Sequence, residues 1–155
     1  MFQSFFPQPK LFFSSLALWS GILILVWYSF GKTIGESLGF DLAETETVIG
    51  LGHFITSELL WFDTFFAFGA LSFFFVWRSR SPHEWQVWSV LGSALLIYLS
   101  YASVQVSVVI NAWYGPFYND IQTALTGDGG ITASDLYGHF LVFCTIAFPY
   151  ILFII

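Results

Sequence analysis

Charged residues are scarce in this 155-residue chain. Lysine and arginine together number four and the acids number ten, so charged residues make up 9% of the chain. Soluble domains have roughly 25%. Hydrophobic residues make up 57%. This composition predicts an integral membrane protein in a lipid bilayer, with no room for a separate soluble domain of about 100 residues. So few basic residues do not provide the cationic surface that a nucleic-acid partner requires.

Several kinds of chemistry are also missing. Cys144 is the only cysteine, so the chain cannot form an intrachain disulfide. Residues 31–33 read Gly-Lys-Thr, but the earlier glycine that a phosphate-binding loop needs is Val26. The histidines have no partner at a metal-ligand spacing, and no nucleophile motif occurs. We therefore predict no enzyme, no cofactor and no metal site; the histidines are His53, His83 and His139.

Long apolar runs dominate what remains. They predict an all-α, polytopic membrane protein with about four transmembrane helices in a single transmembrane domain, residues 1–155. The expected spans are residues 11–30, 54–77, 88–112 and 138–155. We expect residues 1–10 to be an extended interfacial segment, because Pro7 and Pro9 do not continue a helix. Residues 31–52 carry charges and glycines, which predicts a partly helical connection outside the bilayer.

The third expected span, residues 88–112, has polar groups on two faces. At about 1.5 Å per residue it reaches ~37 Å, more than the ~30 Å hydrocarbon core. Gln105 points away from a stripe of small polar residues, along which another helix or an aqueous path would lie. For Gln105 and for Asn111, the last residue of the stripe, we favour a function. For the serines, close helix packing is an equal alternative. The stripe consists of Ser93, Ser100, Ser103, Ser107 and Asn111.

The chain is expected to leave the bilayer after this span. Gly115 and Pro116 predict a break in the helix. The apolar side chains at 117, 121 and 125 then suggest a short helix in the interface. Further on, Thr132 and Asp135 have the spacing of a capping box, which predicts the start of the fourth helix.

Two acids lie in the second expected span. Asp63 is farther inside and is followed by fourteen residues without charge, whereas Glu58 is near the boundary. A carboxylate in a span must face water, pair with another group or take up a proton. Asp63 is therefore a candidate proton carrier. The alternative is that it reaches interfacial water.

The basic residues predict an orientation. With four spans, Lys10, Arg78 and Arg80 lie on one side and only Lys32 on the other, which places the amino terminus in the cytoplasm. The chain ends in an apolar run without a polar anchor. We interpret this end as truncation of a longer protein.

Two motifs carry a resemblance to a known family. The first reads Ser81-Pro82-His83-x-Trp85-Gln86-x-Trp88-Ser89, and the second reads Asn111-Ala112-Trp113-Tyr114-x-Pro116-Phe117-Tyr118, followed by Ile121-Gln122-Thr123-Ala124-Leu125. The opening residues Met1-Phe2-x-Ser4-Phe5-Phe6-Pro7-x-Pro9 agree as well. In these motifs the chain resembles the SbmA/BacA family of bacterial inner-membrane peptide transporters.

The resemblance implies a homodimeric, proton-driven importer of antimicrobial and other peptides. Its membrane fold would be related to that of ABC exporters, without a nucleotide-binding domain. Family members are longer, so the chain would cover their amino-terminal part. The resemblance implies an acid in many members at position 105, where this chain has the neutral Gln105.

Two other readings remain. One is the membrane subunit of an ABC transporter, which would need a separate ATPase. The other is a truncated membrane protein that binds partners without transporting anything. Helices beyond residue 155 without a nucleotide-binding motif would favour the peptide importer.

Overall fold

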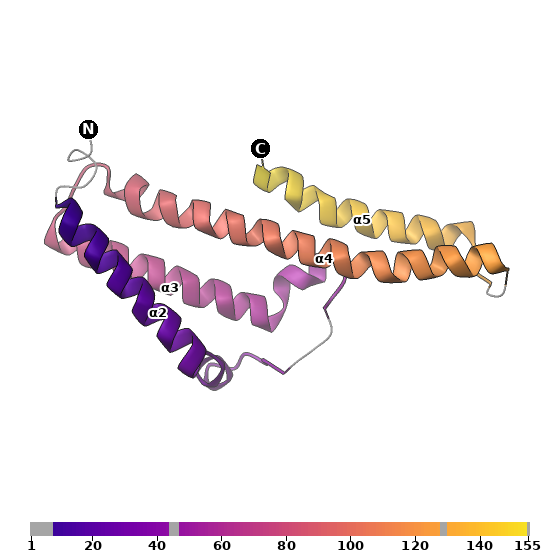
Figure 1. Ribbon diagram of the computed structural model, residues 1–155, viewed down its shortest axis with the longest axis horizontal. Helices are drawn as coiled ribbons and strands as arrows, with labels where there is room; N and C mark the ends of the chain where they lie inside the picture. The colour runs from indigo at the N-terminus through magenta and orange to yellow at the C-terminus, as the bar shows by residue number, and fades with distance from the viewer. Residues whose placement is uncertain (1–7, 44–46, 128–129, 155) are drawn as a thin grey trace. The chain divides into compact units, whose positions relative to one another are not determined.

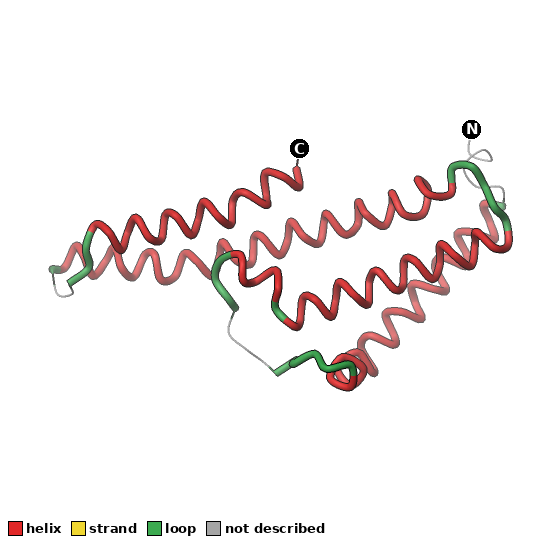
Figure 2. Tube along the Cα trace, turned by 180° about the vertical axis from the view of Figure 1, so that it is seen from behind, coloured by secondary structure: helices red, strands yellow, loops and turns green. Residues whose placement is uncertain are grey.

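The computed structural model describes residues 8–43, 47–127 and 130–154, and within these ranges every regular element is helical (Figures 1 and 2). The prediction of an all-α chain is therefore confirmed. The long helices are α2 (Pro9–Ser37), α3 (Ser57–Arg80), α4 (Ser93–Thr126) and α5 (Ala133–Ile154). A 3-10 turn, η1 (Leu51–Ile55), precedes α3, and a π-helical turn, η2 (Val87–Gly92), leads directly into α4.

Helix length and composition agree with a polytopic membrane protein. Among the described residues, α2, α3 and the continuous stretch from Val87 to Thr126 are long and apolar enough to cross a bilayer. In α5 the apolar stretch Ala133–Phe148 is shorter. Helices α2 and α4 extend beyond the expected spans, so the limits of the membrane segments remain predictions.

The prediction of an extended segment at residues 1–10 is wrong at the carboxyl end of that segment. Pro9 is not in extended chain but opens α2. Proline suits the first helical turn because its missing N–H would have no intrahelical partner there. Residues 1–7 lie outside the described residues.

The chain divides into two compact units. The first unit comprises Met1–Ala43 and Ser57–Tyr98, and the second comprises Glu44–Thr56 and Leu99–Ile155. Helices α2 and α3 and the turn η2 belong to the first unit. The second unit contains η1, most of α4 and all of α5.

Tryptophans join α2 to α3 in the first unit. The indole Nε1 of Trp61 donates to the carbonyl of Gly31 at 3.0 Å, and that of Trp19 donates to the carbonyl of Gly69 at 3.0 Å. The helices approach closely at Gly35, where an added Cβ would lie 2.9 Å from Trp61 Nε1. An aromatic core lies near one end of this pair and contains Phe12, Phe73, Phe74, Trp77 and Val90.

An antiparallel hairpin of α4 and α5 forms the second unit. Val106, Val109 and Trp113 recur on one face of α4 and bury Ile146 of α5. These positions follow the helical spacing of three and four residues, so one stripe of α4 faces α5. Phe54 of η1 packs against the same core.

The predicted helix break at Gly115 and Pro116 is wrong, because α4 continues through both residues to Thr126. Proline removes one backbone hydrogen bond inside a helix. Stacked rings bridge this position: Trp113 and Phe117 lie 4.5 Å apart, and Tyr114 and Tyr118 lie 5.7 Å apart. These contacts support the helix across the proline, so the residues from 117 onward do not form a separate interfacial helix.

The predicted start of α5 is confirmed, and one of the two bonds of the capping box forms. The Asp135 carboxylate accepts the backbone N–H of Thr132 at 2.8 Å. The Thr132 hydroxyl, however, donates to the same carboxylate oxygen at 2.7 Å instead of accepting a backbone N–H. Both bonds hold the pKa of Asp135 below its ordinary value, since they stabilise the charged form.

Candidate functional site

Asp63 lies in the second turn of α3, about 9 Å along the axis from Ser57. Its side chain is half-buried, and Oδ1 is a buried atom without a hydrogen-bond partner among the described residues. The carboxylate is hydrogen-bonded by the hydroxyl of Tyr98, which also lies in the first unit. Phe66 flanks this contact, with its ring 5.8 Å from the Tyr98 ring. Asp63 thus combines one polar partner with one oxygen left free to bind a proton.

Glu58 does not belong to this arrangement. It is exposed and lies in the first turn of α3. Acidic side chains are favourable there because the unpaired N–H groups give the amino end of a helix a partial positive charge. The local role of Glu58 at the helix start accounts for its position.

Gln105 has a partner that the sequence did not reveal. In the second unit, His53 of η1 places Nε2 3.0 Å from Oε1 of Gln105. The side chain of His53 is buried, and its ring lies edge-on to Phe54 at 5.6 Å. The amide oxygen is an acceptor, so the imidazole donates through Nε2.

The polar stripe of α4 lies on the side away from α5. Ser107 and Asn111 are exposed, whereas Val106 and Val109 are fully buried in the hairpin. The hydroxyl of Ser103 donates to the carbonyl of Leu99 at 3.0 Å, and that of Ser107 donates to Ser103 at 3.1 Å. These serines therefore bond within their own helix, and Asn111 projects from its exposed face.

A second histidine pair closes the hairpin. Nε2 of His139 on α5 lies 2.7 Å from Oδ2 of Asp120 on α4. The indole N–H of Trp113 donates to the backbone carbonyl of the same histidine at 2.9 Å. The pair was missed because the two residues are 19 positions apart. Asp120 lies six positions before the end of α4 at Thr126, and His139 lies six positions after the start of α5 at Ala133. This symmetry about the turn is the signal that would have suggested a contact across a helical hairpin.

The first motif forms the turn between α3 and η2. The backbone N–H of Trp85 donates to Nδ1 of His83 at 3.1 Å, and the N–H of Ser81 continues the helix by bonding to Trp77. Pro82 is exposed, whereas Gln86 is 4% exposed and its Oε1 has no partner among the described residues. The motif thus has a structural role in the turn and leaves one buried amide oxygen unpaired.

The second motif provides the aromatic packing of α4. Trp113 is buried, and its ring lies 4.9 Å from that of Phe143 on α5. Phe117 is half-buried against it, whereas Pro116, Tyr118 and Gln122 are exposed. Trp113 is therefore a core residue of the hairpin as well as a candidate interfacial anchor.

One comparison with known proteins bears on α4, α5 and the turn before them. Residues 82–155 match the model of the SbmA/BacA-like family. This range includes both internal motifs except Ser81, so the family resemblance drawn from those motifs is confirmed there. The opening motif precedes the matched range.

Proposed function

We propose, on the premise that residues 82–155 are SbmA/BacA-like, that the chain is the amino-terminal part of a proton-driven peptide importer. The family match and the long apolar helices together support membrane transport as the general function. The finer proposal is import of antimicrobial and related peptides by a homodimer in the bacterial inner membrane. The amino terminus lies in the cytoplasm, as the basic residues indicate.

The observation that carries proton coupling is the environment of Asp63. A carboxylate within a membrane helix is costly unless it is paired, hydrated or protonated. Tyr98 supplies one hydrogen bond, and the buried Oδ1 has no partner within residues 8–43, 47–127 and 130–154. Protonation neutralises the charge and gives the carboxyl a donor, whereas release of the proton restores the charge. Alternation between these two forms is the property that a proton-coupled transporter requires.

His53 is the second residue of the proposal. It is buried and bonded to Gln105, the position at which the family resemblance implies an acid in many members. We assign Gln105 to holding the ring of His53 in place through this hydrogen bond.

The exposed polar stripe of α4 is the proposed substrate path. Asn111 offers two donors and an acceptor, which match the N–H and C=O groups of a peptide backbone. Ser107 lies on the same exposed face. Polar side chains on a membrane helix are stabilised by a water-filled path or by a polar partner, and a passing peptide provides the latter.

Uptake by intact cells tests the proposed function. The protein is expressed from its complete gene in a strain without its own peptide uptake, and entry of a fluorescent cationic peptide is measured. We expect uptake to stop when a protonophore collapses the proton gradient and to persist when ATP is depleted while the gradient is held. Uptake that follows ATP instead would favour the membrane subunit of an ABC transporter, and no uptake would contradict transport.

A further inference from the structure

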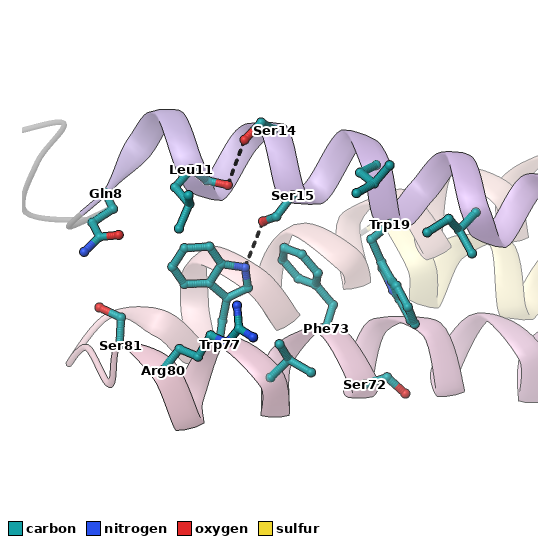
Figure 3. A pocket seen from close by; sticks show the side chains of 13 residues that line it. Gln8, Leu11, Ser14, Ser15, Trp19, Ser72, Phe73, Trp77, Arg80 and Ser81 are labelled. Carbon is teal, nitrogen blue, oxygen red and sulfur yellow. Dashed lines mark hydrogen bonds between the residues drawn. The ribbon is translucent and has the colours of Figure 1, made fainter.

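A groove runs between α2 and α3 on one side of the first unit (Figure 3). Its volume is about 920 Å³. Phe73 and Trp77 of α3 and Trp19 of α2 project between the two helices and line it, and the indole N–H of Trp77 donates to the Ser15 hydroxyl at 3.0 Å. The groove is thus built on packed aromatic residues that are hydrogen-bonded across the helix pair.

The lining is polar at one end and apolar along the rest. Gln8, Arg80 and Ser81 line the end where α2 begins and α3 finishes, Gln8 from the α2 side and the other two from the α3 side (Figure 3). Farther along, aliphatic side chains from both helices line the groove, among them Leu18, which is 68% exposed, and Val76, which is 54% exposed. A ligand that fits this pattern has an anionic head and a long apolar tail.

The length of the groove agrees with such a ligand. Its α2 side runs from Leu11 to Ile22, which is about 16 Å of helix. One leaflet of the hydrocarbon core is half of the ~30 Å thickness, or about 15 Å. An acyl chain that begins at the level of Arg80 and follows the groove would therefore end near the bilayer midplane.

We infer that this groove binds an anionic phospholipid, with the phosphate at Arg80 and one acyl chain along α2 and α3. The guanidinium provides charge and paired donors for a phosphate, and Gln8 and Ser81 add neutral polar groups beside it. The exposed aliphatic side chains provide the apolar walls. A peptide fits less well, because its backbone polar groups would lie unpaired against those walls and a cationic peptide would be repelled by Arg80.

Photolabelling tests this inference on the protein made from its complete gene. The protein is reconstituted in phosphatidylcholine vesicles that contain a small fraction of phosphatidylglycerol with a photoactivatable group in its acyl chain. We expect labels on α2 between Leu11 and Ile22 and on the groove side of α3. A phosphatidylcholine probe of the same chain length is expected to label these segments less.

Matched variants locate the headgroup. Arg80→Gln should reduce phosphatidylglycerol labelling about fivefold, since one basic residue near an anionic headgroup has an effect of that size. Arg78→Gln removes the same charge from the same helix end outside the groove and should leave labelling unchanged. Arg80→Lys should retain most of it. Leu18→Trp should block the tail and remove labelling by both lipids, with membrane insertion unchanged.

Three results would overturn the inference. One is equal labelling by the two lipids. Another is labelling that is insensitive to both Arg80→Gln and Leu18→Trp in variants whose thermal unfolding matches the parent. The third is crosslinking of the groove residues to a second copy of the chain or to a bound peptide in place of lipid.

Discussion

The two units of the chain share one kind of polar contact between helices and differ in another. In the first unit α2 and α3 are joined by indole N–H groups, such as those of Trp19 and Trp61, which donate to backbone carbonyls. In the second unit the indole of Trp113 makes the same kind of bond, to the carbonyl of His139. Histidine side chains add two further contacts there: His53 with Gln105, and His139 with Asp120. Both kinds of bond are short, between 2.7 and 3.0 Å.

The polar groups of the first unit separate stability from proton binding. An indole N–H does not titrate in the physiological range, so the α2–α3 pair keeps its bonds as pH changes. Asp63 is the exception in the first unit, because it is a half-buried acid bonded to Tyr98. The comparison therefore assigns the indole contacts of α2 and α3 to support, whereas the proposed function assigns the proton to Asp63 of α3.

Loss of an indole between α2 and α3 should have the largest effect on the free energy of unfolding. Trp61→Ala removes a ring that is 4% exposed together with its bond to Gly31, and it should lower the free energy of unfolding by about 3–5 kcal/mol. The loss should be the same at pH 5.5 and at pH 8, which lie below and above the ordinary histidine pKa of about 6.5. Thermal unfolding in detergent measures it. Leu60→Ala, at a position that is 42% exposed, is the control and should change little.

Asn111→Leu should impair transport without affecting stability. Loss of about 1 kcal/mol of hydrogen bonding to a passing peptide corresponds to a roughly fivefold decrease in uptake. Membrane insertion should be normal, because the side chain is exposed and leucine suits a membrane helix. Val108→Leu, on an exposed apolar position, is the control. Normal uptake by Asn111→Leu would mean that the stripe serves helix packing.

Loss of the contact between Asp120 and His139 should have a smaller effect on the stability of the hairpin. A double-mutant cycle with Asp120→Asn and His139→Gln should give a coupling free energy of about 0.5–1 kcal/mol, since both side chains are partly exposed. Hydrogen exchange of amides at the α4–α5 turn provides the measurement. A coupling of zero at neutral pH would remove this pair from the account of the hairpin.

Loss of the Asp135 cap at the start of α5 should have the smallest effect on stability, and this effect should depend on pH. Because the folded pKa of Asp135 is lowered, its contribution is present above the unfolded value of about 3.9 and is lost as pH falls through the folded pKa. Amide exchange in the first turn of α5 should accelerate over that acidic range. Asp135→Asn should show the faster exchange at all pH values, whereas Asp135→Glu should restore part of the protection.

Much of the fold follows from local sequence. Apolar runs longer than a bilayer predict the long helices, and the spacing of Thr132 and Asp135 predicts the start of α5. The error at Pro116 has a tertiary cause. Ring stacking between Trp113 and Phe117, together with packing on α5, outweighs the loss of one backbone hydrogen bond.

The contacts of the candidate site are harder to predict from sequence than the helices are. Asp63 was predicted because a single acid in an apolar run is conspicuous, but its bond to Tyr98 depends on the packing of two helices. His53 and Gln105 are 52 residues apart, and no periodic pattern relates a 3-10 turn to a distant helix. Polar side chains within one helix are therefore predictable, whereas their partners from other elements are not.

Proton coupling through Asp63 is the central claim, and proton flux measured together with peptide uptake tests it most directly. Proteoliposomes that contain the protein from its complete gene receive an imposed pH gradient, and internal pH and peptide accumulation are followed. Asp63→Asn should abolish gradient-driven accumulation and the accompanying proton entry with normal protein abundance, whereas Glu58→Gln on the exposed first turn of α3 should keep both. Accumulation by Asp63→Asn at the parent rate would contradict the account.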